Sequence, residues 1–237
     1  MNHHHISQPM PEHTDNNPFN SSTSWLGSSL STIGNIAQLK ESMNNGTALA
    51  VSDGSYDPQS HQASAAYTLL DSTGKHGLEC SMDVPGDASC QNAYRAEVAG
   101  LLGALFLIQV ANYIFDQSHG KVAVYCDGKS ALEQVFDFSR NTSTAKSKQS
   151  DLIMTARNVI QNTDVTLDHH HVKGHQDDKI LIDLLPLPAQ INVHMDQRAK
   201  RHLRTTLTRT THLPLDKSHP DGPRFITTTF ASLTIFH

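Results

Sequence analysis

The sequence predicts an α/β protein built on a five-stranded mixed sheet, in which three antiparallel strands are followed by two parallel ones and helices cover both faces. Three observations support this fold class. The first three apolar segments are separated by short polar turns, as in an antiparallel meander. A long helical segment comes next. The second half then alternates strand and helix, and this order implies a parallel pairing with a right-handed crossover.

The first three strands are expected at residues 48–56, 63–70 and 77–84. The first of them leads from small and apolar residues into a polar tip that contains a glycine, a pattern typical of a strand entering a turn. Polar turns at residues 57–58 and 72–74 divide the three segments. These segments therefore predict a meander.

The long helix is expected at residues 88–115, with small residues on the side that would lie against a sheet and apolar bulk beside them. The elements that follow are a strand at 121–127, helices at 130–138 and 150–161, a strand at 165–172 and a helix at 190–204. We therefore assign a single folded domain to residues 46–206.

The two ends of the chain have a different composition. Residues 1–45 are rich in Asn, Ser, Pro, His and Thr, which predicts a largely disordered extension with at most one weak helix at 25–39. Residues 207–237 are rich in Thr and Pro without clear periodicity, and we expect a poorly structured tail.

The charge balance argues weakly against a free-standing, tight nucleic-acid binder. The chain has 18 Lys and Arg against 23 Asp and Glu, a formal net charge of −5. Basic residues are nevertheless concentrated between positions 198 and 209, so local charge matters more than the total.

Three cysteines without a C-x-x-C pair predict reduced thiols rather than a disulfide framework. We find neither a basic start followed by an apolar core at the N-terminus nor an apolar run that we would expect to span a membrane. The expectation is an intracellular protein, cytoplasmic or nuclear and not secreted.

An Asp in the middle of the first apolar strand is unusual. Burying a lone carboxylate costs several kcal/mol unless it is paired or coordinated, so Asp53 needs a partner. The alternative is that Asp53 only caps a turn through Gly54 and Ser55. The first and fourth strands would be parallel neighbours, and the carboxyl ends of such strands mark the usual binding crevice.

Five short motifs fall in order on the predicted elements between residues 47 and 205. They are Ser52-Asp53-Gly54-Ser55, Tyr94-Arg95-Ala96-Glu97, Tyr125-Cys126-Asp127, His171-Val172-Lys173-Gly174-His175 and Asn192-x-x-x-Asp196. With these motifs the chain resembles a type 1 ribonuclease H domain of the kind that retroelement polyproteins carry beside a reverse transcriptase.

The resemblance implies a ribonuclease H-like fold and an endonuclease that hydrolyses the RNA strand of RNA–DNA hybrids. It also implies two Mg²⁺ ions, for which Mn²⁺ can substitute, bound by Asp53, Glu97, Asp127 and Asp196, with His175 as a catalytic histidine on a mobile loop. Carboxylate oxygens are the ligands that Mg²⁺ prefers. Two such ions activate a water and relieve charge on the leaving oxygen. The implied partners are the hybrid and a tethered reverse transcriptase.

The expected nucleic-acid contacts are Gly54, Ser55, Asn92, Arg95, Lys173 and Arg198. The sequence departs from the family in having Ala93 and Tyr94 where paired asparagines often read the 2′-hydroxyl. The segment between the two later helices is too short for a separate basic handle. Binding of the substrate would then depend on Lys146, Lys148, Lys173 and the last helix, or on a tethered partner domain.

Each site residue also has a simpler interpretation. Glu97 could be a solvated helix residue, Asp127 could cap the helix that follows it, and Asp196 could only pair with Arg198 or Lys200. A zinc site could form from a different set, namely His169, His171 and His175. The competing functions are a non-catalytic domain that positions nucleic acid, and a DNA-directed nuclease or transposase on the same fold.

Overall fold

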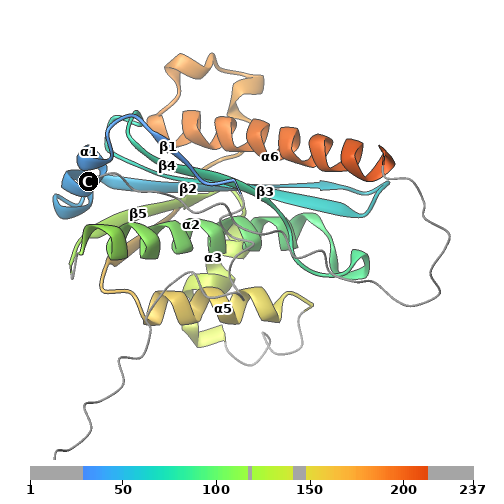
Figure 1. Cartoon of the computed structure of the whole chain (residues 1–237), viewed down its shortest axis with the longest axis horizontal. Helices are drawn as coiled ribbons and strands as arrows, with labels where there is room; N and C mark the ends of the chain where they lie inside the picture. The colour runs from blue at the N-terminus through green and yellow to red at the C-terminus, as the bar shows by residue number, and fades with distance from the viewer. Residues whose placement is uncertain (1–28, 117–118, 141–147, 213–237) are drawn as a thin grey trace, which may run out of the picture.

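The computed structural model describes residues 29–116, 119–140 and 148–212. Their strands form one six-stranded mixed sheet of order β1-β4-β3-β2-β5-β6. Helix α6 covers one face, and α2 lies against the other with α3 and α5 beyond it (Figure 1). The elements are β1 (Ser31–Ile33), α1 (Ile36–Asn44), β2 (Ala48–Asp57), β3 (Gln62–Leu70), β4 (Gly77–Asp83), α2 (Ala93–Phe115), β5 (Lys121–Cys126), α3 (Lys129–Phe136), α5 (Ser150–Gln161), β6 (Thr166–His171) and α6 (Leu187–His212).

The strand pairing confirms the predicted sheet. β2, β3 and β4 are antiparallel neighbours, whereas β5 pairs in parallel with β2 on one side and with β6 on the other. The register places Ser52 of β2 beside Cys126 of β5. The carboxyl end of β5 therefore lies beside the middle of β2, next to Asp53, and β2 continues beyond it to Asp57.

The sheet has one strand more than expected. β1 pairs antiparallel with β4 from Ser31↔Glu79 to Ile33↔Gly77. Only three residues long and partly polar, β1 carries no alternating pattern that would reveal it. It is an edge strand that forms because β4 offers a free edge.

Helix α2 is the centre of the larger core. Most of its residues are buried, and its small-residue side allows a close approach to the sheet. A Cβ atom on Gly103 would lie 2.3–2.5 Å from ring atoms of Tyr67 on β3, so this position cannot hold a larger residue unless the ring moves. The prediction of a small-residue face against the sheet is confirmed.

The same helix corrects an expectation about membranes. By length and composition alone, Ala93–Phe115 could cross a membrane, whereas the sequence analysis found no such run. The most apolar stretch of α2 is mostly buried inside the protein, 72% of it, as expected of a core helix.

The predicted disorder of residues 1–45 is wrong for its last part. Helix α1 begins after Asn35, whose side chain accepts a hydrogen bond from the Ala37 N–H. Its Leu39 and Met43 are fully buried in the main core. These two apolar side chains lie one helical turn apart among polar neighbours. The overall composition of the segment is therefore polar and does not indicate that the segment packs on the core. Residues 1–28 lie outside the described residues.

The domain boundary at residue 206 is also wrong. α6 continues as a helix to His212, past the predicted end at 204. The Thr-rich sequence lowers intrinsic helix propensity, but Thr205 and Thr208 donate hydrogen bonds to the carbonyls one turn earlier. Residues 213–237 lie outside the described part of the chain.

Candidate active site

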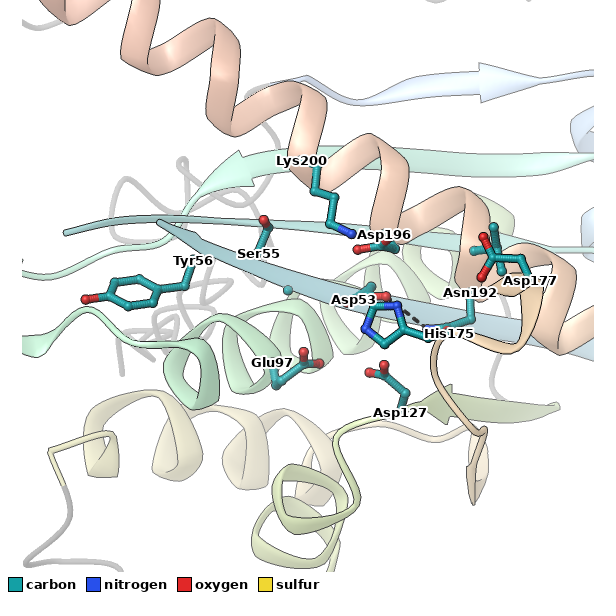
Figure 2. A pocket seen from close by; sticks show the side chains of 12 residues that line it. Asp53, Ser55, Tyr56, Glu97, Asp127, His175, Asp177, Asn192, Asp196 and Lys200 are labelled. Carbon is teal, nitrogen blue, oxygen red and sulfur yellow. Dashed lines mark hydrogen bonds and ion pairs between the residues drawn. The ribbon is translucent and has the colours of Figure 1, made fainter. Parts of the chain in front are cut away.

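The five residues predicted to be catalytic line one cavity of about 220 Å³ (Figure 2). They come from five different segments: β2, α2, the loop after β5, the loop after β6, and α6. These residues are Asp53, Glu97, Asp127, His175 and Asp196. The cavity lies at the carboxyl end of β5, beside the second half of β2, where the parallel pairing of these strands predicts a binding crevice.

Asp53 lies inside β2, between β3 and β5, and is 5% exposed. The side-chain amide of Asn192 donates a hydrogen bond to its Oδ2 at 3.3 Å. Burial, as the largest cause, and the charges of the neighbouring carboxylates Glu97, Asp127 and Asp196 together raise the pKa of Asp53 to about 9. A carboxylate in this position is stable as an anion only if a cation joins it.

The turn-capping alternative for Asp53 is wrong. The residue that organises the turn after β2 is Asp57, whose carboxylate accepts hydrogen bonds from the Gln59 and Ser60 backbone N–H groups. Asp53 lies four positions earlier, inside the strand, and its side chain lines the cavity.

Glu97 is in the second turn of α2, where the helix almost touches β2. A Cβ on Gly54 would lie 2.5 Å from the Ala96 carbonyl carbon and 2.6 Å from the Glu97 nitrogen. Glycine at position 54 therefore permits the contact that brings Glu97 to the cavity. Burial raises the pKa of Glu97 to about 8, with the charge of Asp127 as the next cause. Its side chain points into the cavity (Figure 2), so it is not an ordinary solvated helix residue.

Asp127 directly follows β5, and the loop after β6 packs closely on it. A Cβ on Gly174 would lie 2.4 Å from Asp127 Oδ2, so only glycine lets this loop pass. The His171 Nε2 lies 3.0 Å from the Asp127 carbonyl oxygen and can donate to it. Burial raises the pKa of Asp127, while the nearby His175 opposes the rise.

Asp127 is not a helix cap. The cap residue of α3 is Gly128, and no side chain accepts a hydrogen bond there. Asp127 Oδ1 is instead buried without a hydrogen-bond partner among the described residues. A buried carboxylate oxygen that has no hydrogen-bond partner and lies beside other carboxylates fits the role of a metal ligand.

Asp196 and Lys200 form an ion pair on α6, with Lys200 Nζ 2.7 Å from Asp196 Oδ2. The simpler interpretation of Asp196 is therefore correct as far as the contact goes. Asp196 nevertheless lines the cavity, and its charge contributes to the raised pKa of Asp53. Both residues belong to the site, and Lys200 is a cation that a bound metal would have to displace from Asp196.

His175 enters the cavity from the loop after β6. Its backbone is in the left-handed region, with φ of 51°, and its side chain is exposed. Figure 2 shows its ring over the cavity, in the direction of Asp53 and Asp127. An exposed ring on a loop can change position, which suits a group that moves a proton.

Three of the predicted nucleic-acid contacts have partners within the fold. The Arg95 side chain is 3% exposed and donates two hydrogen bonds to the Asp151 carboxylate, at 2.9 and 2.6 Å. Arg198 is bound to Glu79 of β4 at 2.6 Å. Asn92 caps α2: its Oδ1 accepts from the Arg95 N–H and its Nδ2 donates to the Cys90 carbonyl. The motifs do not reveal these partners, and contact of the three side chains with nucleic acid stays a prediction.

The other three predicted contacts are better placed. Gly54 and Ser55 line the cavity, and Lys173 is exposed on the loop that leads to His175. Lys146 lies outside the described residues. Four more residues that line the cavity were not predicted as site residues: Tyr56, Asp177, Asn192 and Lys200. The helical spacing of four residues indicates the pairing of Lys200 with Asp196, but not that Lys200 lines the cavity.

The zinc alternative has no support in the geometry. His169 stacks on Phe136 and His170 on Tyr125, with ring centroids 4.6 and 5.1 Å apart, while His171 faces the Asp127 carbonyl. In the described part of the chain, the potential metal ligands that form a group of three within 4.8 Å are Glu97, Cys126 and Asp127. Most of the potential metal ligands at the cavity are carboxylate oxygens, which are hard donors and suit Mg²⁺ or Mn²⁺.

No protein-family model and no curated protein matches the sequence. Among solved structures, one match is LC11-RNase H1 in complex with an RNA/DNA hybrid. The two sequences are 15% identical, and the TM-score is 0.48. The match covers 68% of the present chain and 99% of the LC11-RNase H1 chain. Another is the N-terminal RNase H domain of Rv2228c from Mycobacterium tuberculosis, with 13% identity, 69% and 97% coverage and a TM-score of 0.45. The chain is similar to ribonuclease H domains. At these values the likeness says nothing about activity, and the function has to be argued from the site.

Proposed function

We propose that this protein is a metal-dependent endonuclease that hydrolyses the RNA strand of RNA–DNA hybrids with two Mg²⁺ ions, or Mn²⁺ in their place. The observation that carries the proposal is the convergence of four carboxylates from four separate elements on one cavity. Burial and mutual repulsion raise the pKa of Asp53, Glu97 and Asp127. Divalent cations would remove that repulsion and make all four groups anionic at neutral pH.

The four carboxylates Asp53, Glu97, Asp127 and Asp196 would hold the ions. Bound metal supplies an activated water and relieves charge on the leaving oxygen. Asn192 orients Asp53 through the hydrogen bond to Oδ2. His175 at the cavity rim would carry a proton to the leaving group or assist its release.

The hybrid is the proposed substrate because of the motif order along the chain. Glu97 on the long helix and the Val172–His175 stretch after the last strand argue against a transposase-type nuclease on the same topology. Gly54 and Ser55 at the cavity edge are the residues best placed to face the RNA strand, and Lys173 to face a phosphate.

The described residues offer few cations for binding the phosphates of the hybrid. Arg95 and Arg198 are engaged in ion pairs within the fold, and Lys200 is paired with Asp196. We therefore propose that a tethered domain, such as the reverse transcriptase of an intracellular retroelement, supplies most of the affinity for the hybrid.

The test is incubation with a labelled RNA–DNA hybrid beside matched double-stranded DNA and double-stranded RNA, with Mg²⁺ or with excess chelator. We expect cleavage of the RNA strand of the hybrid alone, leaving 3′-hydroxyl and 5′-phosphate ends, and only with metal. Asp168→Asn is a suitable control for the site variants, because Asp168 is a surface carboxylate on β6 paired with Lys121. Equal cutting of double-stranded DNA, or full activity in chelator, would contradict the proposal.

A further inference from the structure

A buried thiol connects two of the carboxylates at the cavity. Cys126 is the last residue of β5, is fully buried, and lies next to Asp127 in the chain. Its Sγ donates a hydrogen bond to Glu97 Oε2 at 3.4 Å. The same sulfur accepts the Gly128 backbone N–H at 3.3 Å. A chain of two hydrogen bonds therefore runs from the loop that carries Asp127 to the carboxylate of Glu97.

Gly128 constrains Glu97 from a second side. A Cβ at position 128 would lie 3.1 Å from Glu97 Cγ, 3.2 Å from its Cβ and 3.3 Å from its Oε2. The Glu97 side chain thus packs directly on the Gly128 backbone. The residues on either side of Asp127 both contact Glu97, so the position of one carboxylate depends on the position of the other.

We infer that Cys126 is a positioning residue, which fixes the Glu97 carboxylate relative to Asp127 and thereby sets the metal affinity of the site. The inference deepens the proposed function and rests on it. A thiol is a weak hydrogen-bond donor. It can hold Oε2 in place while drawing little electron density from it, so the carboxylate stays a good ligand.

This role differs from that of an ordinary buried cysteine. Cys80 on β4 is also fully buried, but its Sγ lies 3.7 Å from Ser29 Oγ, and Cys80 belongs to none of the carboxylate motifs. Removing either sulfur leaves a small space in the core, but only removal at position 126 leaves Glu97 Oε2 without this donor. Partners of metal ligands matter for this reason: their loss typically costs about 10–100-fold in metal affinity or activity.

The experiment compares Cys126→Ala, Cys126→Ser and the control Cys80→Ala. Two readouts are needed: the Mg²⁺ concentration for half-maximal hybrid cleavage, and the Mg²⁺ concentration for half of the thermal shift without substrate. We expect Cys126→Ala to raise both by about 10-fold, with the KM for the hybrid changed less than about two-fold. Cys126→Ser retains a donor and should return both to within about three-fold of the wild type. Cys80→Ala should leave both unchanged, even where it lowers thermal stability.

Gly128→Ala is an independent second variant, which decides the matter if Cys126→Ala does not fold. Its new methyl group would press on the Glu97 side chain, the nearest group to it, and would leave the sulfur in place. It should raise the same Mg²⁺ concentrations in both readouts.

The inference is overturned if both Cys126→Ala and Gly128→Ala bind and use Mg²⁺ as the wild type does, or if Cys126→Ser behaves like Cys126→Ala. In that case the wild type still cleaves hybrids and the proposed function stands. A wild type that shows neither cleavage nor a Mg²⁺-dependent thermal shift overturns both proposals at once.

Discussion

At the scale of single residues, the defining property of the site is that its carboxylates are held close together and partly out of water. The usual partner of a buried carboxylate is a cation of the protein, such as an arginine. Here Arg95 and Arg198 are paired with Asp151 and Glu79 instead. Lys200 is the cation that lines the cavity, and it contacts only Asp196 of the four.

This arrangement predicts an unusual pH dependence of stability in chelator. The pKa of Asp53 rises from 3.8 to about 9 on folding, so the folded state holds this proton more tightly than the unfolded state. The stabilising contribution of protonated Asp53 is fully present below about pH 4 and is lost as the pH rises toward about 9. Glu97, with its pKa raised to about 8, acts in the same direction. Thermal melts from about pH 5 to pH 9 should show falling stability in chelator, and Mg²⁺ should restore stability at the alkaline end.

Asp53→Asn tests the cause of that dependence. The amide keeps the shape of the side chain and removes its charge, so the variant should lose less stability between about pH 5 and pH 9 than the wild type in chelator. Hybrid cleavage should be abolished, because the central ligand of the site is gone. A variant that folds and cleaves at a near-native rate would place the active site elsewhere. Asp168→Asn should change neither property appreciably, since its pair with Lys121 is exposed to water and contributes little to stability.

His175 should behave differently from the carboxylates. It is exposed on a loop and is expected to move a proton rather than to hold metal. His175→Ala should slow turnover by about 10²-fold or less, the scale of general acid–base groups. The Mg²⁺ concentration for half of the thermal shift should not change. An increase as large as that caused by Asp196→Asn would make His175 a ligand.

The carboxylates could be predicted from the sequence because each lies in a short motif on a recognisable element. The roles of Arg95 and Arg198 could not. Their partners, Asp151 and Glu79, lie 56 and 119 positions away in the chain, so only the folded structure brings them together. A basic residue next to a catalytic motif therefore does not by itself indicate contact with nucleic acid.

At the scale of elements, the site depends on how closely α2 approaches β2. Gly54→Ala would place a methyl group 2.5–2.7 Å from atoms of Ala96 and Glu97, two of which belong to the backbone. We expect a loss of about 1–3 kcal/mol in the free energy of unfolding, as in other overpacked sites, together with reduced cleavage because Glu97 moves. Chemical denaturation measures the first effect. Ser55→Ala, on the same strand, should change stability by less than about 0.5 kcal/mol. A similar value for Gly54→Ala would show that the helix can move away freely.

The elements that escaped prediction, β1 and α1, have little local signal. β1 is three residues long, and α1 has nine residues, most of them polar or small. Both are stabilised by contacts with segments distant in the sequence: β1 pairs with β4, and α1 places Leu39 and Met43 in the main core. Secondary-structure propensity and composition depend only on residues that are close in the sequence. They therefore miss elements that are stabilised by tertiary contacts.

At the scale of the whole molecule, the folded unit is longer at both ends than the sequence suggests. A chain of residues 46–207 lacks β1, α1 and the last turn of α6. It should be less stable than a chain of residues 29–212 by at least about 2–5 kcal/mol, the cost of emptying a single buried Leu or Met position. Denaturation of the two fragments measures the difference. Equal stability would mean that α1 packs on the sheet without supporting it.

The sheet order could be predicted in advance because each step has a physical rule. Short polar turns give antiparallel neighbours, and a strand–helix–strand unit gives a parallel pair with a fixed hand. Together these rules make β2 and β5 parallel neighbours, as observed. The rules do not specify side-chain partners, and this is why the four carboxylates could be predicted as a group while the links through Asn192 and Cys126 required the structure.

We propose that these carboxylates form one site for two divalent cations on a bound hybrid. The most direct measurement is anomalous diffraction from crystals of the Asp196→Asn variant grown with Mn²⁺ and an RNA–DNA hybrid. We predict two anomalous peaks roughly 4 Å apart in the cavity, both within ligand distance of Asp53, with a phosphate of the RNA strand between them. A cavity without anomalous peaks, or peaks at His169 and His171 instead, would contradict it.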